Sequence, residues 1–112
     1  MSQSAIASIT VQELFELKQQ RPVEIVDVRT AEEFREVRAA GVRHVPMDAI
    51  DLHELVNSRT LSPNEPLYFI CHLGGRSAHV CLAMKAAGYD NVVNVTGGTE
   101  AWEEAGLPVE RG

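Results

Sequence analysis

Apolar and polar positions change period several times along this chain, from runs typical of strands to spacings typical of helices. Apolar, mostly β-branched residues dominate the runs 23–28, 67–70 and 91–95, and we interpret these as strands. Between them apolar residues recur three or four positions apart, as on the buried face of a helix. This alternation predicts an α/β fold with a mostly parallel sheet, in which ligand sites form beyond the carboxyl ends of the strands.

Two capping boxes indicate where helices begin. Residues 10–13 (Thr-Val-Gln-Glu) open a first helix, which residues 21–22 (Arg-Pro) end, and residues 30–33 (Thr-Ala-Glu-Glu) open a second. We expect the second helix to carry Val37 and to end at Gly41. The other expected elements are a short edge strand at 6–9, a short strand at 42–45, a loose helix from about 50 to 57, a helix from about 76 to 88 and a short helix at 99–105.

An apolar strand delivers Cys71 to a turn that opens a helix. Gly74 and Gly75 let the backbone curl with its N–H groups inward, and the helix adds its own unpaired N–H groups at the same place. The helix dipole and Arg76 also favour a thiolate there. A cysteine at a buried strand end is usually just a small apolar residue. A structural strand end does not need these glycines, Arg76 or Ser77, so we interpret Cys71 as a nucleophile.

Length, composition and charge narrow the classes of function. The 112 residues predict one domain, 1–112, and the net charge of −6 disfavours nucleic acid as the main partner. No apolar run reaches the roughly 18–20 residues that span a bilayer, so we expect no membrane segment. Two cysteines make no disulfide framework, and the lack of a signal peptide favours a reducing, cytoplasmic setting.

Three motifs, taken together and in this order, resemble the rhodanese family of sulfurtransferases over nearly the whole chain. They are Asp27-Val28-Arg29 followed by Glu33-Phe34, then Cys71-x-x-Gly74-x-Arg76-Ser77, then Gly97-Gly98 followed by Ala101-Trp102. The resemblance implies a three-layer α/β sandwich with a central five-stranded, mostly parallel sheet flanked by helices. The chain departs from the family pattern at 37–42, where the family commonly has Gly-His-Ile-Pro-Gly-Ala and only the second glycine is retained.

The resemblance also implies an activity and a site. The activity is transfer of a sulfane sulfur, for example from thiosulfate, through a persulfide on Cys71, and it implies no cofactor. The expected partners are a small anionic sulfur donor and an acceptor that is cyanide or a thiol, including a protein thiol. The residues expected to bind substrate are His72, Leu73, Gly74, Gly75, Arg76 and Ser77. Asp27 and Arg29 could touch substrate, but we favour a buried ion pair that supports the loop.

Individual side chains carry further expectations. Arg76 either binds an anionic donor or pairs with Asp27 or Glu33, with pairing slightly favoured. Ser77 is expected to cap the helix or to donate a hydrogen bond near the sulfur, and His72 to point to solvent.

Cys81 lies ten residues after Cys71, in line with Val80 and Met84 on the predicted buried helix face. This position favours core packing over a role as a resolving thiol. We expect no metal site, because the cysteines and histidines lack the paired short spacings of structural zinc ligands.

Two other functions stay open on sequence alone. A cysteine-dependent phosphatase or arsenate reductase also uses a cysteine, a backbone cradle and an arginine. Only four residues lie between Cys71 and Arg76, whereas phosphatase loops are one residue longer, which favours sulfur chemistry. The other alternative is a non-catalytic rhodanese-like binding module, although such modules lose the cysteine. Whether thiosulfate leaves a sulfur on the protein that cyanide removes would separate these functions.

Overall fold

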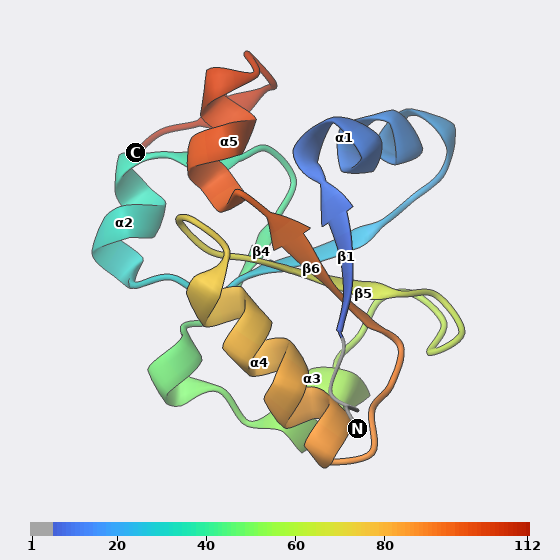
Figure 1. Cartoon of the computed structure of the whole chain (residues 1–112). Coiled ribbons are helices and arrows are strands. Elements are labelled where there is room, and N and C mark those ends of the chain that lie inside the picture. Colours follow the sequence, from blue (N-terminus) through green and yellow to red (C-terminus); the bar gives the residue numbers. More distant parts are fainter. Residues whose placement is uncertain (1–5) are drawn as a thin grey trace.

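The computed structural model describes residues 6–112, and a five-stranded sheet lies at its centre (Figure 1). The strands are β1 (Ala7–Thr10), β2 (Glu24–Asp27), β4 (Arg43–His44), β5 (Leu67–Ile70) and β6 (Val92–Thr96). Their order in the sheet is β1-β6-β5-β2-β4, and every pairing is parallel. The prediction of a parallel five-stranded sheet with an edge strand near the N-terminus is therefore confirmed.

Helices cover both faces of the sheet. They are α1 (Val11–Gln20), α2 (Ala31–Glu36), the 3-10 turn η1 (Met47–Ala49), α3 (Leu52–Asn57), α4 (Gly75–Ala86) and α5 (Gly98–Glu104). In Figure 1, α1 and α5 lie above the sheet and α3 and α4 lie below it. The predicted three-layer sandwich is confirmed. Within residues 6–112, no helix has the length and apolar character needed to cross a membrane.

Side chains that alternate along the central strands fill two apolar cores. Val26 and Phe69 belong to the core under α3 and α4, whereas Ile25 and Ile70 belong to the core under α1 and α5. Trp102 of α5 is fully buried in the second core. Burying a Val, Leu, Ile or Phe side chain contributes roughly 1.5–3 kcal/mol. These two cores pack against both faces of the sheet beneath the loops at its carboxyl edge.

Both capping boxes form as the sequence predicts. Thr10 Oγ1 accepts from the Glu13 N–H at 3.1 Å, while Glu13 Oε1 accepts from the Thr10 N–H at 3.0 Å. Thr30 and Glu33 make the same reciprocal pair at 3.2 and 3.1 Å. Each box satisfies two backbone groups that would otherwise lack partners at a helix start. Local sequence therefore fixes where α1 and α2 begin.

The predicted end of the second helix is wrong. Helix α2 stops before Val37, whose backbone is extended, and the chain does not stay helical to Gly41. Residues Arg38–Ala39 form β3, which pairs antiparallel with β7 (Val109–Glu110), a strand that the sequence did not predict. The Val37 carbonyl, which would bond within a longer helix, instead accepts from Arg29 Nη2. Tertiary hydrogen bonds thus end the helix early.

The loose helix expected from about 50 to 57 begins only at Leu52, as α3, and the separate 3-10 turn η1 ends before Ile50. Ile50 lies between them in an extended conformation. Asp51 caps α3, because its Oδ1 accepts from the Glu54 N–H at 3.0 Å. Ile50 and Leu52 still pack against the core below the sheet, so the apolar positions were interpreted correctly and the helix boundary was not.

Three turns meet at the carboxyl edge of the sheet, because β6, β5 and β2 are adjacent and parallel. One turn leads from β2 to α2, one carries Cys71 from β5 to α4, and one carries Gly97 from β6 to α5. In Figure 1 the loop between β5 and α4 lies next to the start of α5 and faces α2. The fold therefore brings together the segments that contain the three sequence motifs.

Candidate active site

The Cys71 sulfur lies directly after β5 and is enclosed by the start of α4. The residue is 1% exposed, and its Sγ accepts hydrogen bonds from the Gly74 N–H at 3.0 Å and from Ser77 Oγ at 3.2 Å. Gly74 has φ +113°, a left-handed conformation that side-chain-bearing residues rarely adopt. A Cβ there would also lie 3.4 Å from the Gly97 nitrogen. Glycine at position 74 therefore allows the backbone to turn its N–H toward the sulfur.

Two opposing effects set the acidity of the Cys71 thiol. Burial is the largest influence and by itself raises the pKa. The Ser77 hydroxyl and the N–H groups of Ser77, Gly74 and Arg76 stabilise the thiolate instead. Together these donors outweigh burial, and the pKa of Cys71 lies below its ordinary value. The site is built to hold negative charge on sulfur.

Ser77 links the sulfur to a residue that the sequence did not single out. Its fully buried hydroxyl lies 2.6 Å from Asn94 Oδ1 on β6, as well as 3.2 Å from Cys71 Sγ. Asn94 Nδ2 in turn donates to the Gly74 carbonyl at 3.2 Å. Because the Ser77 hydroxyl has a single proton, Asn94 Oδ1 and the Cys71 sulfur compete for it, and Asn94 positions both this hydroxyl and the Gly74 carbonyl beside the sulfur. Only the pairing of β6 with β5 reveals this role, because nothing in the strand pattern distinguishes this polar residue.

The first turn of α5 supports the loop from the other side. The Thr99 N–H and hydroxyl both donate to the Cys71 carbonyl, at 2.8 and 3.0 Å, and the Glu100 N–H donates to the His72 carbonyl at 3.1 Å. A Cβ at Gly98 would come within 2.5 Å of both carbonyl oxygens. The second glycine of the Gly97-Gly98 motif is thus required by close backbone approach, and Thr99 is a supporting residue that sequence analysis missed.

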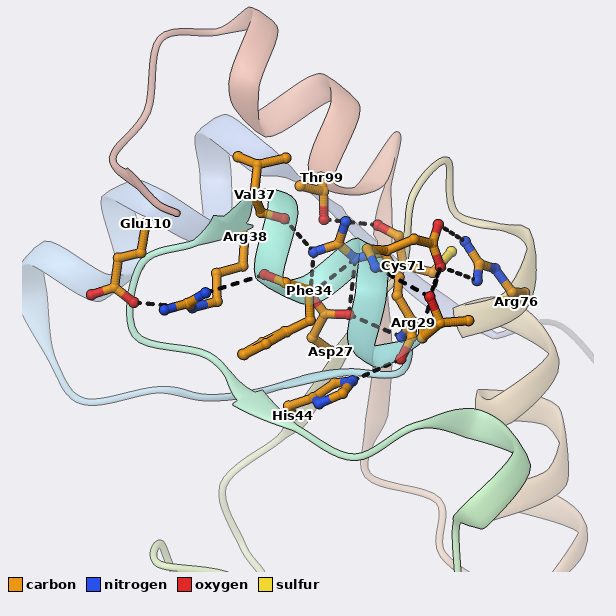
Figure 2. Close-up of polar contacts among 12 residues, drawn as sticks. Asp27, Arg29, Phe34, Val37, Arg38, His44, Cys71, Arg76, Thr99 and Glu110 are labelled. Carbon is orange, nitrogen blue, oxygen red and sulfur yellow. Dashed lines mark hydrogen bonds and ion pairs between the residues drawn. The ribbon is translucent and has the colours of Figure 1, made fainter. Parts of the chain in front are cut away.

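Arg76 pairs with Glu33, one of the two partners that the sequence left open. Arg76 Nη1 donates to Glu33 Oε1 at 2.8 Å and Nη2 donates to Oε2 at 2.9 Å, in a two-pronged ion pair (Figure 2). The hydrogen bonds from Arg76, helped by those from Thr30 and opposed by burial, lower the pKa of Glu33 to about 2. The same pairing raises the pKa of Arg76. Both side chains stay about one-third exposed, at 38% and 32%.

Asp27 and Arg29 form the buried ion pair that the sequence favoured. Arg29 Nε donates to Asp27 Oδ1 at 3.0 Å and Nη2 donates to Oδ2 at 2.9 Å, with both side chains almost fully buried. Arg29 Nη2 also donates to the Val37 carbonyl at 2.6 Å, and His44 Nε2 donates to the Arg29 carbonyl at 2.8 Å. Phe34 stacks on His44 with ring centroids 4.2 Å apart. Figure 2 shows these contacts of Asp27, Arg29 and His44 beside α2, the helix that contains Glu33.

The arrangement agrees with known proteins. Residues 10–105 match the sequence profile of the rhodanese-like domain. The chain belongs to the rhodanese-like domain family. This rhodanese-like domain is 32% identical over 106 residues to the thiosulfate sulfurtransferase GlpE of Actinobacillus succinogenes, covering 95% of this chain and 92% of that protein. It is 35% identical over 78 residues to the putative sulfur carrier protein YrkF of Bacillus subtilis, covering 70% of this chain.

The solved structures point to the same family. A rhodanese-like domain protein from Staphylococcus aureus superposes with a TM-score of 0.72 at 38% identity, covering 94% of this chain and 99% of the other. The rhodanese-like domain described here spans only 40% of the length of the sulfur carrier protein, but 92% of GlpE. The resemblance inferred from the three motifs is confirmed.

The sulfur of this rhodanese-like domain faces a shallow opening of about 250 Å³. The residues that line it are Cys71, His72, Leu73, Gly75 and Arg76. His72 is exposed, as expected, and its backbone carbonyl rather than its ring holds the loop. Leu73 is 60% exposed and gives the opening an apolar rim. The substrate-binding set expected from the sequence therefore divides into lining residues and the enclosed donors Gly74 and Ser77.

Cys81 lies in the core below the sheet and is fully buried among apolar neighbours. Burial raises its pKa to about 12, despite a small opposing effect of Lys85. Both cysteines are free thiols. The packing position expected for Cys81 is confirmed. In the described part of the chain, residues 6–112, no cluster of three His, Cys, Asp or Glu side chains has a metal-binding arrangement.

Proposed function

We propose that this chain is a sulfurtransferase that carries a sulfane sulfur as a persulfide on Cys71. The observation that carries the proposal is the Cys71 sulfur, enclosed after β5 with the Gly74 N–H and the Ser77 hydroxyl directed at it. A thiolate in this position, at the bottom of an opening, can attack a substrate as a nucleophile. The 32% identity to a thiosulfate sulfurtransferase over almost the full length of both proteins supports this function.

The reaction proceeds in two half-reactions that balance without an oxidant or reductant. The Cys71 thiolate attacks the outer sulfur of the donor, and a new S–S bond forms. The bond between that sulfur and the rest of the donor breaks, and the electron pair leaves with the departing group, which is sulfite when thiosulfate is the donor. A nucleophilic acceptor such as cyanide or a thiol then attacks the outer sulfur and returns the electron pair to Cys71. Such a covalent cycle gives ping-pong kinetics.

The loop donors serve both half-reactions. They stabilise the thiolate before attack, and the exposed N–H groups at the start of α4 are available to the charged outer sulfur of the persulfide. In comparable anion holes, removing one such donor costs about 2.7–4 kcal/mol of barrier. Gly74 and Ser77 are therefore proposed as the donors that matter most, and Asn94 as the residue that positions the Ser77 hydroxyl and the Gly74 carbonyl.

The Arg76–Glu33 ion pair argues against a phosphatase. A phosphatase loop uses its arginine to grip two oxygens of a phosphoryl group. Here both terminal nitrogens of Arg76 are already bound to Glu33. The backbone, and not a free guanidinium, is left to meet the substrate, which suits a single anionic sulfur better than a tetrahedral oxyanion.

Intact-mass measurement after incubation with thiosulfate tests the proposed function. The wild-type chain should gain the mass of one sulfur atom and lose it on addition of cyanide, with release of thiocyanate. Cys71→Ser should gain nothing, whereas Cys81→Ser should behave as wild type because Cys81 is sealed in the core. A sulfur adduct on Cys71→Ser, or hydrolysis of a phosphate ester that depends on Cys71, would overturn the proposal. A wild-type chain that no sulfane donor loads would do the same and would favour the binding module.

A further inference from the structure

Among the described residues that line the opening, the one permanent positive charge is already paired with a carboxylate. Of the five residues that line the opening, all within the described part of the chain, Arg76 alone carries a permanent positive charge. Its two terminal nitrogens are both bound by Glu33, at 2.8 and 2.9 Å. A donor that reaches the opening therefore meets an ion pair and not a free guanidinium.

Glu33 cannot easily release Arg76, because the capping box of α2 also holds its carboxylate. Glu33 Oε1 accepts from the Thr30 N–H at 3.1 Å and from Thr30 Oγ1 at 3.2 Å, in addition to its bond from Arg76. Swinging the carboxylate aside would break bonds at the helix start as well as the ion pair. The charge of Glu33 is thus held next to Arg76, which lines the opening.

The surroundings of Arg76 add no replacement cation. A second cavity of about 200 Å³ also borders Arg76, and its lining includes Arg29 and Asp48. Arg29 is almost fully buried and bound to Asp27, while Asp48 is exposed and acidic. The whole chain carries a net charge of −6. A doubly charged anion is therefore repelled by the protein and by the Cys71 thiolate, and the backbone N–H groups of the loop, rather than a free side-chain cation, are left to offset that repulsion.

We propose that Glu33 determines donor specificity, by occupying Arg76 so that the opening favours a persulfide carried on a thiol over a small dianion such as thiosulfate. This inference rests on the proposed sulfur transfer by Cys71. A thiol-borne persulfide carries at most one negative charge on its sulfurs, and its organic part can lie against the exposed side chain of Leu73. Glu33 acts through Arg76 and is thus a positioning residue.

The reaction with such a donor also balances. The Cys71 thiolate attacks the outer sulfur of the persulfide, and the S–S bond of the donor breaks. The electron pair leaves on the inner sulfur of the donor as a thiolate, which takes up the proton that the outer sulfur carried. Cys71 is left as the persulfide anion, and the donor is released as a thiol.

Glu33→Gln provides the test, because a glutamine preserves the capping box while it removes the charge. With thiosulfate and cyanide, the variant should show a KM lowered by about tenfold at unchanged kcat, as expected for freeing one charge-assisted anion contact. With the persulfide of 2-mercaptoethanol as donor, KM should stay within about twofold of wild type, because that donor does not need the guanidinium. Added salt should reduce the difference in KM for thiosulfate between Glu33→Gln and the wild type.

Glu13→Gln is the matched control. Glu13 closes the capping box of α1 with Thr10, as Glu33 does for α2, but among residues 6–112 no arginine pairs with its carboxylate. This control makes the same charge change but should alter neither the KM for thiosulfate nor the KM for the persulfide donor. Glu33→Gln in an Arg76→Met background should also give no gain, since Glu33 acts through Arg76.

The outcomes separate this inference from the proposed function. An unchanged KM for thiosulfate in Glu33→Gln, or equal shifts for the two donors, would overturn the role of Glu33 while Cys71 still becomes loaded. A gain that survives in the Arg76→Met background would overturn it as well. If neither donor loads wild-type Cys71 by intact mass, the proposed sulfur transfer itself fails.

Discussion

The two cysteines of this chain are equally buried and chemically opposite. Cys71 is 1% exposed and Cys81 is fully buried, yet the pKa of Cys71 lies below its ordinary value while that of Cys81 rises to about 12. Cys71 leaves a strand where the backbone turns its unpaired N–H groups inward. Cys81 sits within α4, where the helix already uses its own N–H groups, among apolar side chains. The hydrogen-bond donors that reach the sulfur, and not how deeply it is buried, decide which thiol can react.

Replacing Cys71 should have the largest effect on activity. Cys71→Ser should abolish sulfur transfer, because a serine hydroxyl stays protonated where a thiol ionises. The free energy of unfolding should change by less than about 1 kcal/mol, since the hydroxyl can keep the same donors. Steady-state transfer from thiosulfate to cyanide and urea unfolding measure the two effects. Transfer at the wild-type rate would refute Cys71 as the sulfur carrier.

The pH dependence of alkylation should sharpen the contrast between the two thiols. The rate of Cys71 modification by iodoacetamide should reach half its plateau below about pH 8.5, the ordinary value for cysteine, because a lowered pKa makes more thiolate at neutral pH. Cys81 should stay unmodified in the folded protein at the same pH. Peptide mapping after timed labelling distinguishes the sites, and labelling in denaturant should erase the difference. A Cys71 midpoint at or above that of free cysteine would mean that burial dominates.

Ser77→Ala should move Cys71 toward the behaviour of Cys81. The variant loses the hydroxyl donor to the sulfur but keeps the Gly74 N–H, so the alkylation midpoint of Cys71 should rise. Sulfur transfer should fall by about 100- to 1,000-fold, as for the loss of one donor in comparable anion holes. Ser8→Ala on the exposed face of β1 is the control and should change neither quantity. An unchanged alkylation midpoint would mean that the backbone N–H groups alone lower the pKa of Cys71.

Cys81→Ser should have the smallest effect on chemistry and a measurable effect on stability. Its hydroxyl would be buried among apolar side chains, which costs about 1–3 kcal/mol when no hydrogen-bond partner is gained. Cys81→Ala removes the polar group and should recover part of this loss. Sulfur transfer should stay close to wild type in both variants. Loss of transfer without loss of stability would instead make Cys81 a relay for sulfur.

Local signals explain why most of the fold could be predicted. The capping boxes at Thr10 and Thr30 act within four residues, so their helix starts follow from sequence alone. The pairing of β3 with β7 joins two-residue segments about seventy positions apart, and so short a ladder leaves no periodic pattern. For this reason the end of α2 was misplaced.

The sequence predicts the loop around Cys71 but not the residues of other elements that hold this loop in place. The order of residues 71–77 indicates a cradle around Cys71, because a turn and a helix start are local features. Asn94 and Thr99 were missed, since their roles depend on which strand lies beside β5 and on how closely α5 approaches the loop. Glu33 could be named only as one of two acids, because sequence does not fix the distance across the sheet edge. The cytoplasmic setting and the single-domain boundary stay predictions.

The bonds from α5 to the loop have a consequence for synthesis on the ribosome. Strand β5 and the Cys71 segment leave the exit tunnel before Thr99 and Glu100, whose groups hold the carbonyls of Cys71 and His72. Until those residues emerge, the nascent chain carries the cysteine without the clamp that shapes its surroundings. The backbone on either side of the reactive sulfur therefore gains these hydrogen bonds only after the first turn of α5 has been made.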